Sequence, residues 1–309
     1  MDNAQANLNV LILGAGGIGG YFGGQLIQAG AEVTFLVRPG RKAQLEAQGL
    51  VIQSRFGDAR LAVKARLASE LDATYDLVIL ACKAYDLEAA MAEATGVLPL
   101  LNGVSHLTVL NQRFGQDRVL GGTAKIAVTL TPEGVVRHLN EWHTVTFGEQ
   151  DGHISARVAT LKSLFDRTSV EAIISGDIMR ELWLKLVHLG TVATVTSLMR
   201  ANVGEIVRTP EGRGLFQRVL DTHIEIAIRE GHAPDKAFIA TYRALFSQAD
   251  STYEASLLRD IERGRPIEAD HILGFLLERC RAHGLDDQVH RLAYTGTKAY
   301  EQRRDAGRL

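Results

Sequence analysis

Three glycines near the start of the chain have the spacing of a turn that can bind phosphate. Gly14, Gly16 and Gly19 stand in the order Gly-x-Gly-x-x-Gly. Such glycines permit a tight turn, let a backbone approach a pyrophosphate, and let a helix pack closely on a strand. A following helix presents free N–H groups and a positive dipole end to phosphate. A glycine-rich turn is often only a turn, so the flanking elements must decide. The candidate dinucleotide contacts are Gly14, Ala15, Gly16, Gly17, Ile18 and Gly19.

The end of the second predicted strand indicates which dinucleotide is bound. An NAD site usually has an acidic residue at this point, where it binds the ribose 2′-hydroxyl. Here the chain has the cations Arg38, Arg41 and Lys42 and no acid. Because arginine binds a phosphate dianion well, we expect NADP(H), with Arg38 as the first contact to the 2′-phosphate. The alternative is a solvated basic turn, and Arg41 and Lys42 are expected to begin the next helix.

Lys185 is the first candidate for proton transfer. On a helix that begins near Asp177, it falls within an apolar stripe that includes Leu182 and Leu189. Burial of an ammonium group is costly and lowers its pKa, which suits a proton donor near neutral pH. The alternatives are an ion pair with Glu181 or a side chain that reaches water.

Glu268 lies in a second chemically suggestive stretch, after Pro266, and is expected in the first turn of a helix. The simpler explanation for it is an acid favoured by the helix dipole. Ser256, twelve residues earlier, is expected on a helix and carries no signal by itself.

Two further polar residues follow predicted strands. Lys83 comes after the strand predicted over 76–81, and Asn102 comes after the one over 97–101. Ligands of open α/β sheets bind outside the carboxyl ends of the strands. Alone, Lys83 would be a surface lysine and Asn102 a turn residue, but their shared location supports both as ligand contacts.

The elements around these residues predict an α/β fold. A strand over 8–13, the glycine turn, a helix over 18–28 and a strand over 32–37 give the context that the motif requires. We expect strands over 123–130, 135–139 and 144–147 at the far edge of the same sheet, in antiparallel pairing. Helices follow from about residue 177. The sequence therefore predicts a Rossmann-type doubly wound sheet over residues 1–176 and an all-helical domain over 177–309.

Composition excludes several classes of protein. The formal net charge of -2 gives no basic excess for nucleic acid. Two cysteines, Cys82 and Cys280, do not make a disulfide framework and favour a reducing compartment. The apolar runs are shorter than a membrane span needs, and the first residues lack a signal-peptide pattern. We therefore expect a cytoplasmic protein with neither nucleic-acid nor membrane partners. We also find no metal-ligand cluster.

Taken together, these stretches resemble the ketopantoate reductase (2-dehydropantoate 2-reductase) family. The resemblance spans residues 8 to about 290. It rests on LILGAGGIGGYFGGQL, the Lys83 turn, LLNGV at 100–104, ELWLKL at 181–186, SLLRDIERGRPIEADHILG at 256–274 and the late RCRAHGL. It implies a two-domain enzyme that uses NADPH to reduce 2-dehydropantoate, a branched 2-oxo acid, to pantoate on the route to pantothenate.

The resemblance also implies roles for single residues. Lys185 would protonate the carbonyl oxygen as hydride arrives, and Glu268 would bind a substrate hydroxyl and hold the active geometry. Ser256 would contact the substrate carboxylate, and Asn102 would lie near both nicotinamide and substrate. We therefore count Lys185 and Glu268 as catalytic, Asn102 and Ser256 as substrate-binding, and Asn102 and Glu268 also as cofactor-binding. Lys83 lies on the cofactor side.

One departure from the family pattern concerns the substrate. Asparagines are expected four and eight residues after the lysine, but the chain has Leu189 and Ala193. This makes the pocket more apolar and puts 2-dehydropantoate itself in question. His188 could supply a polar contact, although a packed or exposed histidine is the simpler explanation. The alternatives are a reductase or opine-type dehydrogenase of another 2-oxo acid, and a non-catalytic NADP-binding regulator. Helical second domains often dimerise, so a homodimer stays open.

Overall fold

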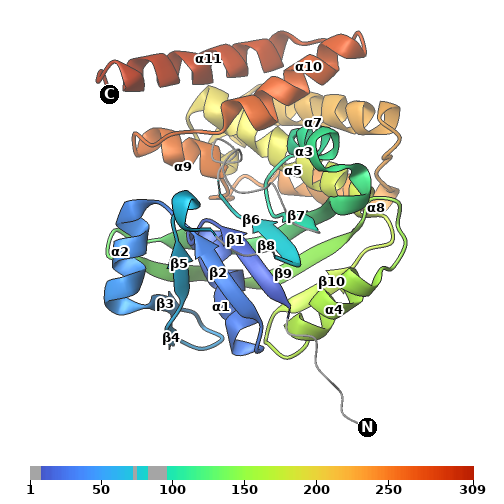
Figure 1. Ribbon diagram of the computed structural model, residues 1–309. Helices are drawn as coiled ribbons and strands as arrows, with labels where there is room; N and C mark the ends of the chain where they lie inside the picture. The colour runs from blue at the N-terminus through green and yellow to red at the C-terminus, as the bar shows by residue number, and fades with distance from the viewer. Residues whose placement is uncertain (1–7, 72–74, 83–95) are drawn as a thin grey trace. The chain divides into compact units, whose positions relative to one another are not determined.

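The computed structural model describes residues 8–71, 75–82 and 96–309. These residues form two compact units. The first comprises the chain up to Leu101 together with His106–Ile178, and the second comprises Asn102–Ser105 together with Met179–Leu309. Strands occur in the first unit, whereas the described part of the second unit is helical (Figure 1).

A parallel five-stranded sheet forms the centre of the first unit. Its strand order is β5-β2-β1-β6-β7, and β1 pairs in parallel with both β2 and β6. Strands buried on both faces are continuous apolar runs, and Val10 to Leu13 of β1 are all buried. The strands predicted over 8–13, 32–37, 76–81 and 97–101 are confirmed, each slightly shortened. Their bounds are β1 (Asn9–Leu13), β2 (Glu32–Leu36), β5 (Lys64–Arg66), β6 (Leu77–Leu80) and β7 (Val97–Pro99).

Helix α1 (Gly17–Gln28) packs between two sheets through two pairs of glycines. A Cβ atom on Gly19 or Gly23 would approach Ile12 of the parallel sheet, at 3.1 and 2.7 Å. A Cβ atom on Gly20 would lie 2.7 Å from Val136, and one on Gly24 would lie 2.4 Å from Ile52. Both of these belong to a second sheet. Because these glycines have no side chains, both sheets can approach the helix backbone closely, one on each side.

This second sheet corrects one prediction. The strands expected over 123–130, 135–139 and 144–147 do not lie at the edge of the nucleotide-binding sheet, and the last two are one continuous strand, β9. The antiparallel pairing of β8 with β9 is as predicted, but it occurs in a separate five-stranded sheet. An isolated bridge joins Val97 of β7 to Val119, directly before β8. The second glycine face of α1 explains the location, because it gives another sheet a surface to pack on. The bounds are β3 (Leu50–Gln53), β4 (Ala59–Leu61), β8 (Leu120–Leu130), β9 (Val135–Glu149) and β10 (Glu171–Ile174).

Three further helices belong largely to the first unit: α2 (Pro39–Gln48), α3 (Ser105–Phe114) and α4 (Ala156–Phe165). Short 3-10 turns occur at η1 (Ala68–Glu70) and η3 (Gln116–Arg118). Pro39 stands at the first position of α2, where a missing N–H has no cost. Arg41 and Lys42 lie in the first turn of this helix, as expected.

The second unit is built around helix α5 (Ile178–Met199). This helix is long and apolar enough to cross a membrane by length and composition, but most of its surface is buried within the protein, as for a core helix. The other elements are α6 (Val203–Val207), α7 (Gly212–Arg229), α8 (Lys236–Leu245), α9 (Ser256–Glu262), the π-helical turn η4 (Asp270–Gly274), α10 (Phe275–Ala282) and α11 (Gln288–Asp305).

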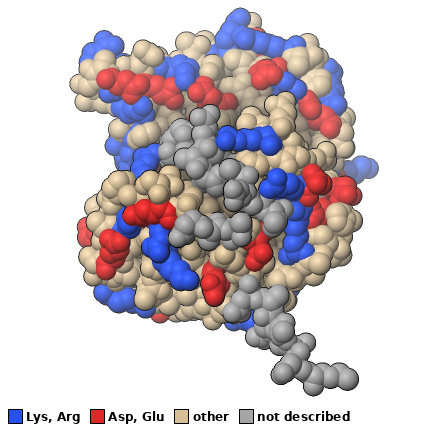
Figure 2. Space-filling view, in the orientation of Figure 1, with Lys and Arg blue, Asp and Glu red and all other residues tan. Residues whose placement is uncertain are grey.

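Charges of both signs are mixed on the visible surface. Figure 2 shows Lys and Arg interspersed with Asp and Glu, without an extended area of one sign. This agrees with the formal net charge of -2.

The strand order and the helices described above make the fold a Rossmann-type doubly wound sheet followed by a helical region.

Candidate active site

The glycine turn has the backbone geometry that its motif predicts. Gly14 has a φ of +91°, a conformation that favours glycine, and its N–H donates to the carbonyl of Leu36 at 2.9 Å. A Cβ atom on Gly19 would lie 2.0 Å from the Gly14 oxygen. Apart from its chain neighbours, no described residue has an atom within 4 Å of the Cβ position of Gly16. The turn is therefore tightly packed between Gly14 and Gly19 and open at Gly16.

The start of α1 fits a phosphate group. Gly16 occupies the N-cap position without a side chain, and no acidic residue stands in the first turn. The N–H groups of this turn have no intrahelical acceptor, and the helix dipole favours a negative charge beside them. The backbone of Gly17 and the side chain of Ile18 complete this turn, while Ala15 is buried beneath it. The residues present can hold the pyrophosphate of a dinucleotide.

The cations after β2 differ in their environment. Arg38 occupies the N-cap position of α2 and is exposed. Lys42 instead donates to both carboxylate oxygens of Glu70, at 2.6 and 2.7 Å. The side chain of Arg41 turns inward and binds the carbonyl of Ala15. Arg38 is therefore the one of these three that is both exposed and at the tip of β2. Lys83 lies outside the described residues.

Lys185 lies on α5 in a strongly desolvated position. Its neighbours along the helix, Leu184 and Leu186, are buried. Lys185 keeps part of its surface exposed, but burial lowers the pKa of its ammonium group from 10.5 to about 8. The cause is desolvation of the charged form. A group with this pKa can donate a proton near neutral pH and become reprotonated without a large barrier.

The turn that carries Asn102 packs on η4. Gly103 has a φ of +82°, and a Cβ atom there would lie 3.0 Å from the His271 oxygen. The hydroxyl of Ser105 lies 3.5 Å from His271 Nδ1. Asn102 is exposed at the tip of this turn. The turn and the start of the η4 helix are therefore held together within the second unit.

The sequence predicted Glu268 in the first turn of a helix, but the residue lies directly before that turn. The helix begins at Ala269 and passes at once into the π-helical turn. Pro266, which was expected to start the helix, stands three residues before Ala269. Glu268 is half-buried, between the buried residues Ile267 and Ala269. It is thus fixed by its buried neighbours at the start of the helix that the Asn102 turn contacts.

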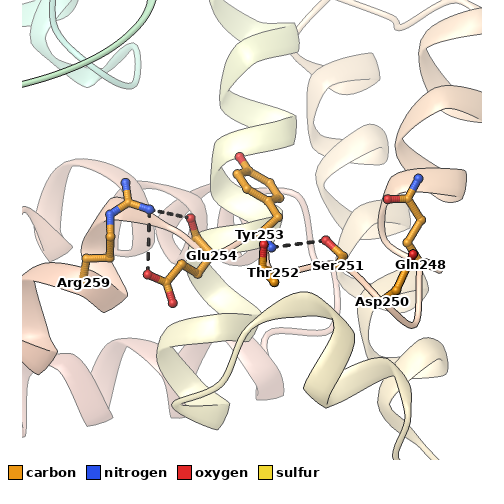
Figure 3. A pocket seen from close by; sticks show the side chains of 7 residues that line it. All are labelled: Gln248, Asp250, Ser251, Thr252, Tyr253, Glu254 and Arg259. Atoms are coloured by element: carbon orange, nitrogen blue, oxygen red, sulfur yellow. Dashed lines mark hydrogen bonds and ion pairs between the residues drawn. The ribbon is translucent and has the colours of Figure 1, made fainter. Parts of the chain in front are cut away.

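Ser256 is the first residue of α9 and is exposed. A cavity of about 560 Å³ lies beside this helix start. Its wall comes from Arg259 of α9 and from the segment before that helix: Gln248, Asp250, Ser251, Thr252, Tyr253 and Glu254 (Figure 3). Arg259 donates to the carbonyl of Glu254 at 3.2 Å. Ser256 itself is not part of this wall.

An aromatic cluster that sequence reasoning did not find surrounds His188. Tyr253 Oη lies within hydrogen-bonding distance of His188 Nε2, at 2.8 Å. The His188 ring also stacks on Tyr242, with 4.5 Å between the ring centroids. Burial raises the pKa of Tyr253 to about 12, so its hydroxyl stays protonated. Because His188 follows Lys185 by three residues, both lie on one face of α5.

This cluster gives the Lys185 face of α5 a mixed aromatic and apolar character. Leu189, one helical turn after Lys185, is half-buried, and Ala193 is buried. His188 was expected to be simply packed or exposed, and the Tyr253 bond is the contact that the sequence did not indicate. Within the described ranges, no group of three His, Cys, Asp or Glu side chains could hold a metal ion.

Family descriptions match most of the chain. Residues 10–152 match "Ketopantoate reductase PanE/ApbA". Residues 177–301 match the C-terminal part of the same family. The two matches cover the sheet with its glycine turn and the helices that carry Lys185, Ser256 and Glu268.

Curated relatives are similar over nearly their full length. An uncharacterized oxidoreductase, YkpB of Bacillus subtilis (strain 168), is 33% identical over 95% of this chain and 99% of its own. A 2-dehydropantoate 2-reductase of Halobacterium salinarum is 28% identical over 90% of this chain and 94% of its own.

Solved structures give the same result for the fold. The 2-dehydropantoate 2-reductase from Methylococcus capsulatus superposes with a TM-score of 0.83 at 26% identity, over 96% of this chain and 98% of that one. A D-mandelate dehydrogenase, solved with NADH and anilino(oxo)acetate, has a TM-score of 0.83 at 22% identity, over 96% and 100% of the two chains. The glycine turn, the full-length matches and the fold agree: the chain is an NAD(P)-dependent oxidoreductase of the ketopantoate reductase family.

Proposed function

We propose that this protein uses NADPH to reduce a 2-oxo acid to a 2-hydroxy acid, with 2-dehydropantoate as the first candidate substrate and pantoate as the product. The observation that carries this proposal is the desolvated ammonium group of Lys185, with its pKa lowered to about 8. Reduction of a carbonyl leaves negative charge on oxygen, and a cation there stabilises it and supplies a proton. The named relatives support the substrate.

The cofactor contacts follow from the glycine turn. NADPH, when bound, supplies the hydride. Gly14, Ala15, Gly16, Gly17, Ile18 and Gly19 would hold its pyrophosphate. The exposed side chain of Arg38 would bind its 2′-phosphate, which NADH lacks. Lys83, outside the described residues, would contact the cofactor as well.

The remaining candidate residues would bind and orient the substrate. Lys185 would donate the proton to the carbonyl oxygen. Glu268 would accept a hydrogen bond from a substrate hydroxyl, and Ser256 would donate to its carboxylate. Asn102 and Glu268 would also contact the cofactor. The anchoring of the Asn102 turn on η4 supports a shared role, because it fixes this turn at the helix that Glu268 precedes.

A second candidate is the reduction of a 2-oxo acid with a bulkier apolar or aromatic side chain. Leu189 and Ala193 favour it, because they are apolar and follow Lys185 by about one and two helical turns. His188 favours it too, because it shares a face of α5 with Lys185 and contacts the aromatic rings of Tyr242 and Tyr253. The D-mandelate dehydrogenase with the same fold holds anilino(oxo)acetate, an aromatic 2-oxo acid derivative. An opine-type dehydrogenase, which needs an amine as co-substrate, and a non-catalytic NADP-binding regulator stay as alternatives.

The organisation of the protein is part of the proposal. Residues 1–176 would form the NADP-binding domain, and residues 177–309 would form a substrate domain that also serves in a homodimer. The cytoplasm is the proposed compartment, because two cysteines do not make a disulfide framework and NADPH is an intracellular reductant. Nucleic acid and membrane are not proposed as partners.

One assay tests chemistry and cofactor together. NADPH and NADH oxidation is followed by absorbance with a panel of 2-oxo acids that includes 2-dehydropantoate, pyruvate and phenylglyoxylate, with and without an amine. The proposal expects turnover with NADPH and no need for an amine, and Lys185→Met should lower kcat at least a hundredfold. Lys236→Met, at the exposed start of α8, is the matched control. Cofactor binding without turnover on any acid would instead support the regulator.

A further inference from the structure

Arg41 makes a contact that its place in the sequence did not indicate. It stands in the first turn of α2, three residues after Arg38, but its side chain runs inward. Its Nε donates to the carbonyl oxygen of Ala15 in the glycine turn at 2.9 Å. Its Nη1 donates to the carbonyl oxygen of Gly134, in the turn between β8 and β9, also at 2.9 Å. One guanidinium thus joins three segments of the first unit.

The bond to Ala15 fixes the direction of a neighbouring N–H group. The peptide bond between Ala15 and Gly16 is planar and trans, so its C=O and N–H point to opposite sides. Because Arg41 holds the Ala15 oxygen on one side, the Gly16 N–H is directed to the other. Among the described residues, none but the chain neighbours of Gly16 comes within 4 Å of a Cβ atom placed there. Arg41 therefore controls the orientation of a donor on the open side of the turn.

The β8–β9 turn is shaped to receive this side chain. Gly134 has a φ of +87°, and a Cβ atom there would lie 2.8 Å from Arg41 Nη1. Gln44 and Gln48, on the same face of α2, donate to the carbonyls of Pro132 and Glu133 at 3.2 and 2.7 Å. This face of α2 thus binds three successive carbonyls of the turn.

Placing a guanidinium here has a cost, which points to a role beyond filling space. Burial lowers the pKa of Arg41, although the group stays charged. Its Nη2 is sealed from solvent and has no acceptor among the described residues. A buried donor without a partner is unfavourable, and a glutamine or methionine would avoid much of this cost.

We propose that Arg41 is a positioning residue of the dinucleotide site, which holds the glycine turn in its phosphate-binding conformation and ties it to α2, where Arg38 occupies the N-cap position. This inference rests on the proposed function only in requiring that the turn binds a dinucleotide. It separates two roles within one helical turn: Arg38 recognises the 2′-phosphate, and Arg41 supports the pyrophosphate contact that NADPH and NADH share.

The test compares affinities for both cofactors. Dissociation constants of NADPH and NADH are measured by isothermal titration calorimetry for the wild type, Arg41→Met, Arg41→Lys and Arg38→Ala. Loss of one charged hydrogen bond predicts that Arg41→Met weakens both cofactors about tenfold and by the same factor. Arg41→Lys, with one short donor head in place of the fork, should recover part of the loss. Arg38→Ala should weaken NADPH alone.

Gln48→Met is the matched control, because it breaks a bond from the same helix face to the same turn and leaves Ala15 untouched. It should leave both dissociation constants within about twofold. The proposal would be overturned if Arg41→Lys and Arg41→Met both bound the two cofactors as the wild type does. It would also be overturned if Arg41→Met failed to fold and Arg41→Lys bound both cofactors with wild-type affinity. So would a loss confined to NADPH, because Arg41 would then contact the 2′-phosphate itself. A wild type that binds neither cofactor would instead refute the proposed function.

Discussion

Replacing Lys185 with methionine should stabilise the protein while it abolishes turnover. The pKa of the ammonium group is lowered from 10.5 to about 8 by burial. One pKa unit corresponds to about 1.4 kcal/mol, so the charged form is disfavoured by about 3 kcal/mol in the folded state. Solvent at the exposed part of the side chain reduces this to about 2 kcal/mol. Methionine keeps an apolar stem of similar length and removes the charge, so Lys185→Met should gain about 2 kcal/mol at pH 7.

The stabilisation expected from Lys185→Met should depend on pH, because the lysine has different pKa values in the folded and unfolded protein. Below pH 8 the lysine is protonated in both states, and the folded protein bears the full cost. Between pH 8 and 10.5 the folded form loses its proton first, so wild-type stability from this group rises with pH. Urea unfolding of the wild type and Lys185→Met at pH 7 and pH 10.5 measures this directly. The difference in free energy of unfolding should shrink toward zero at the higher pH, whereas Lys236→Met should stay within about 0.5 kcal/mol of the wild type at both. A Lys185→Met difference that is equal at both pH values would refute the reasoning.

Three other predictions follow from local geometry. Gly19→Ala should abolish cofactor binding measured by calorimetry, because its Cβ atom would lie 2.0 Å from the Gly14 oxygen; retained affinity would contradict the turn geometry. Gly103→Ala should destabilise the protein by about 1–2 kcal/mol in urea unfolding and lower kcat, because the residue has a φ of +82°; an unchanged kcat would separate this turn from catalysis. His290, buried against His223 with 2.8 Å between their Nε2 atoms, has its pKa lowered from 6.5 to about 4 by desolvation. Its unfolded form therefore takes up a proton first, and about 2–3 kcal/mol of stability should be lost as the pH falls from 6.5 to 4; a flat urea midpoint across this range would count against it.

Local patterns predicted the part of the fold that contains the glycine turn. β1, the turn, α1 and β2 are contiguous, and each carries its own signal in burial pattern and glycine spacing. Lys185 could be found in the same way, because an ammonium group in an apolar helical stripe is costly wherever the helix packs. The sequence also indicated that Arg38 stands at the tip of β2.

Features that depend on distant segments could not be predicted. The separate sheet that contains β8 and β9 packs on Gly20 and Gly24 of α1, which are far from it in the sequence. The Arg41 contact to Gly134 joins residues 93 positions apart, and the His188 bond to Tyr253 joins residues 65 apart. Glu268 was placed in a helix that begins one residue later. The proline at position 266 was expected to start the helix, but the helix starts three residues later, at Ala269.

The pH dependence of the reduction tests the central claim most directly. With the best 2-oxo acid of the panel, kcat/KM is measured from pH 6 to 10 at saturating NADPH for the wild type and Lys185→Met. If the ammonium group of Lys185 is the proton donor, wild-type kcat/KM should be constant at low pH and fall about tenfold per pH unit above its pKa of about 8. A wild-type profile that stays flat between pH 7 and 10, or a Lys185→Met variant that retains wild-type turnover, would contradict the account.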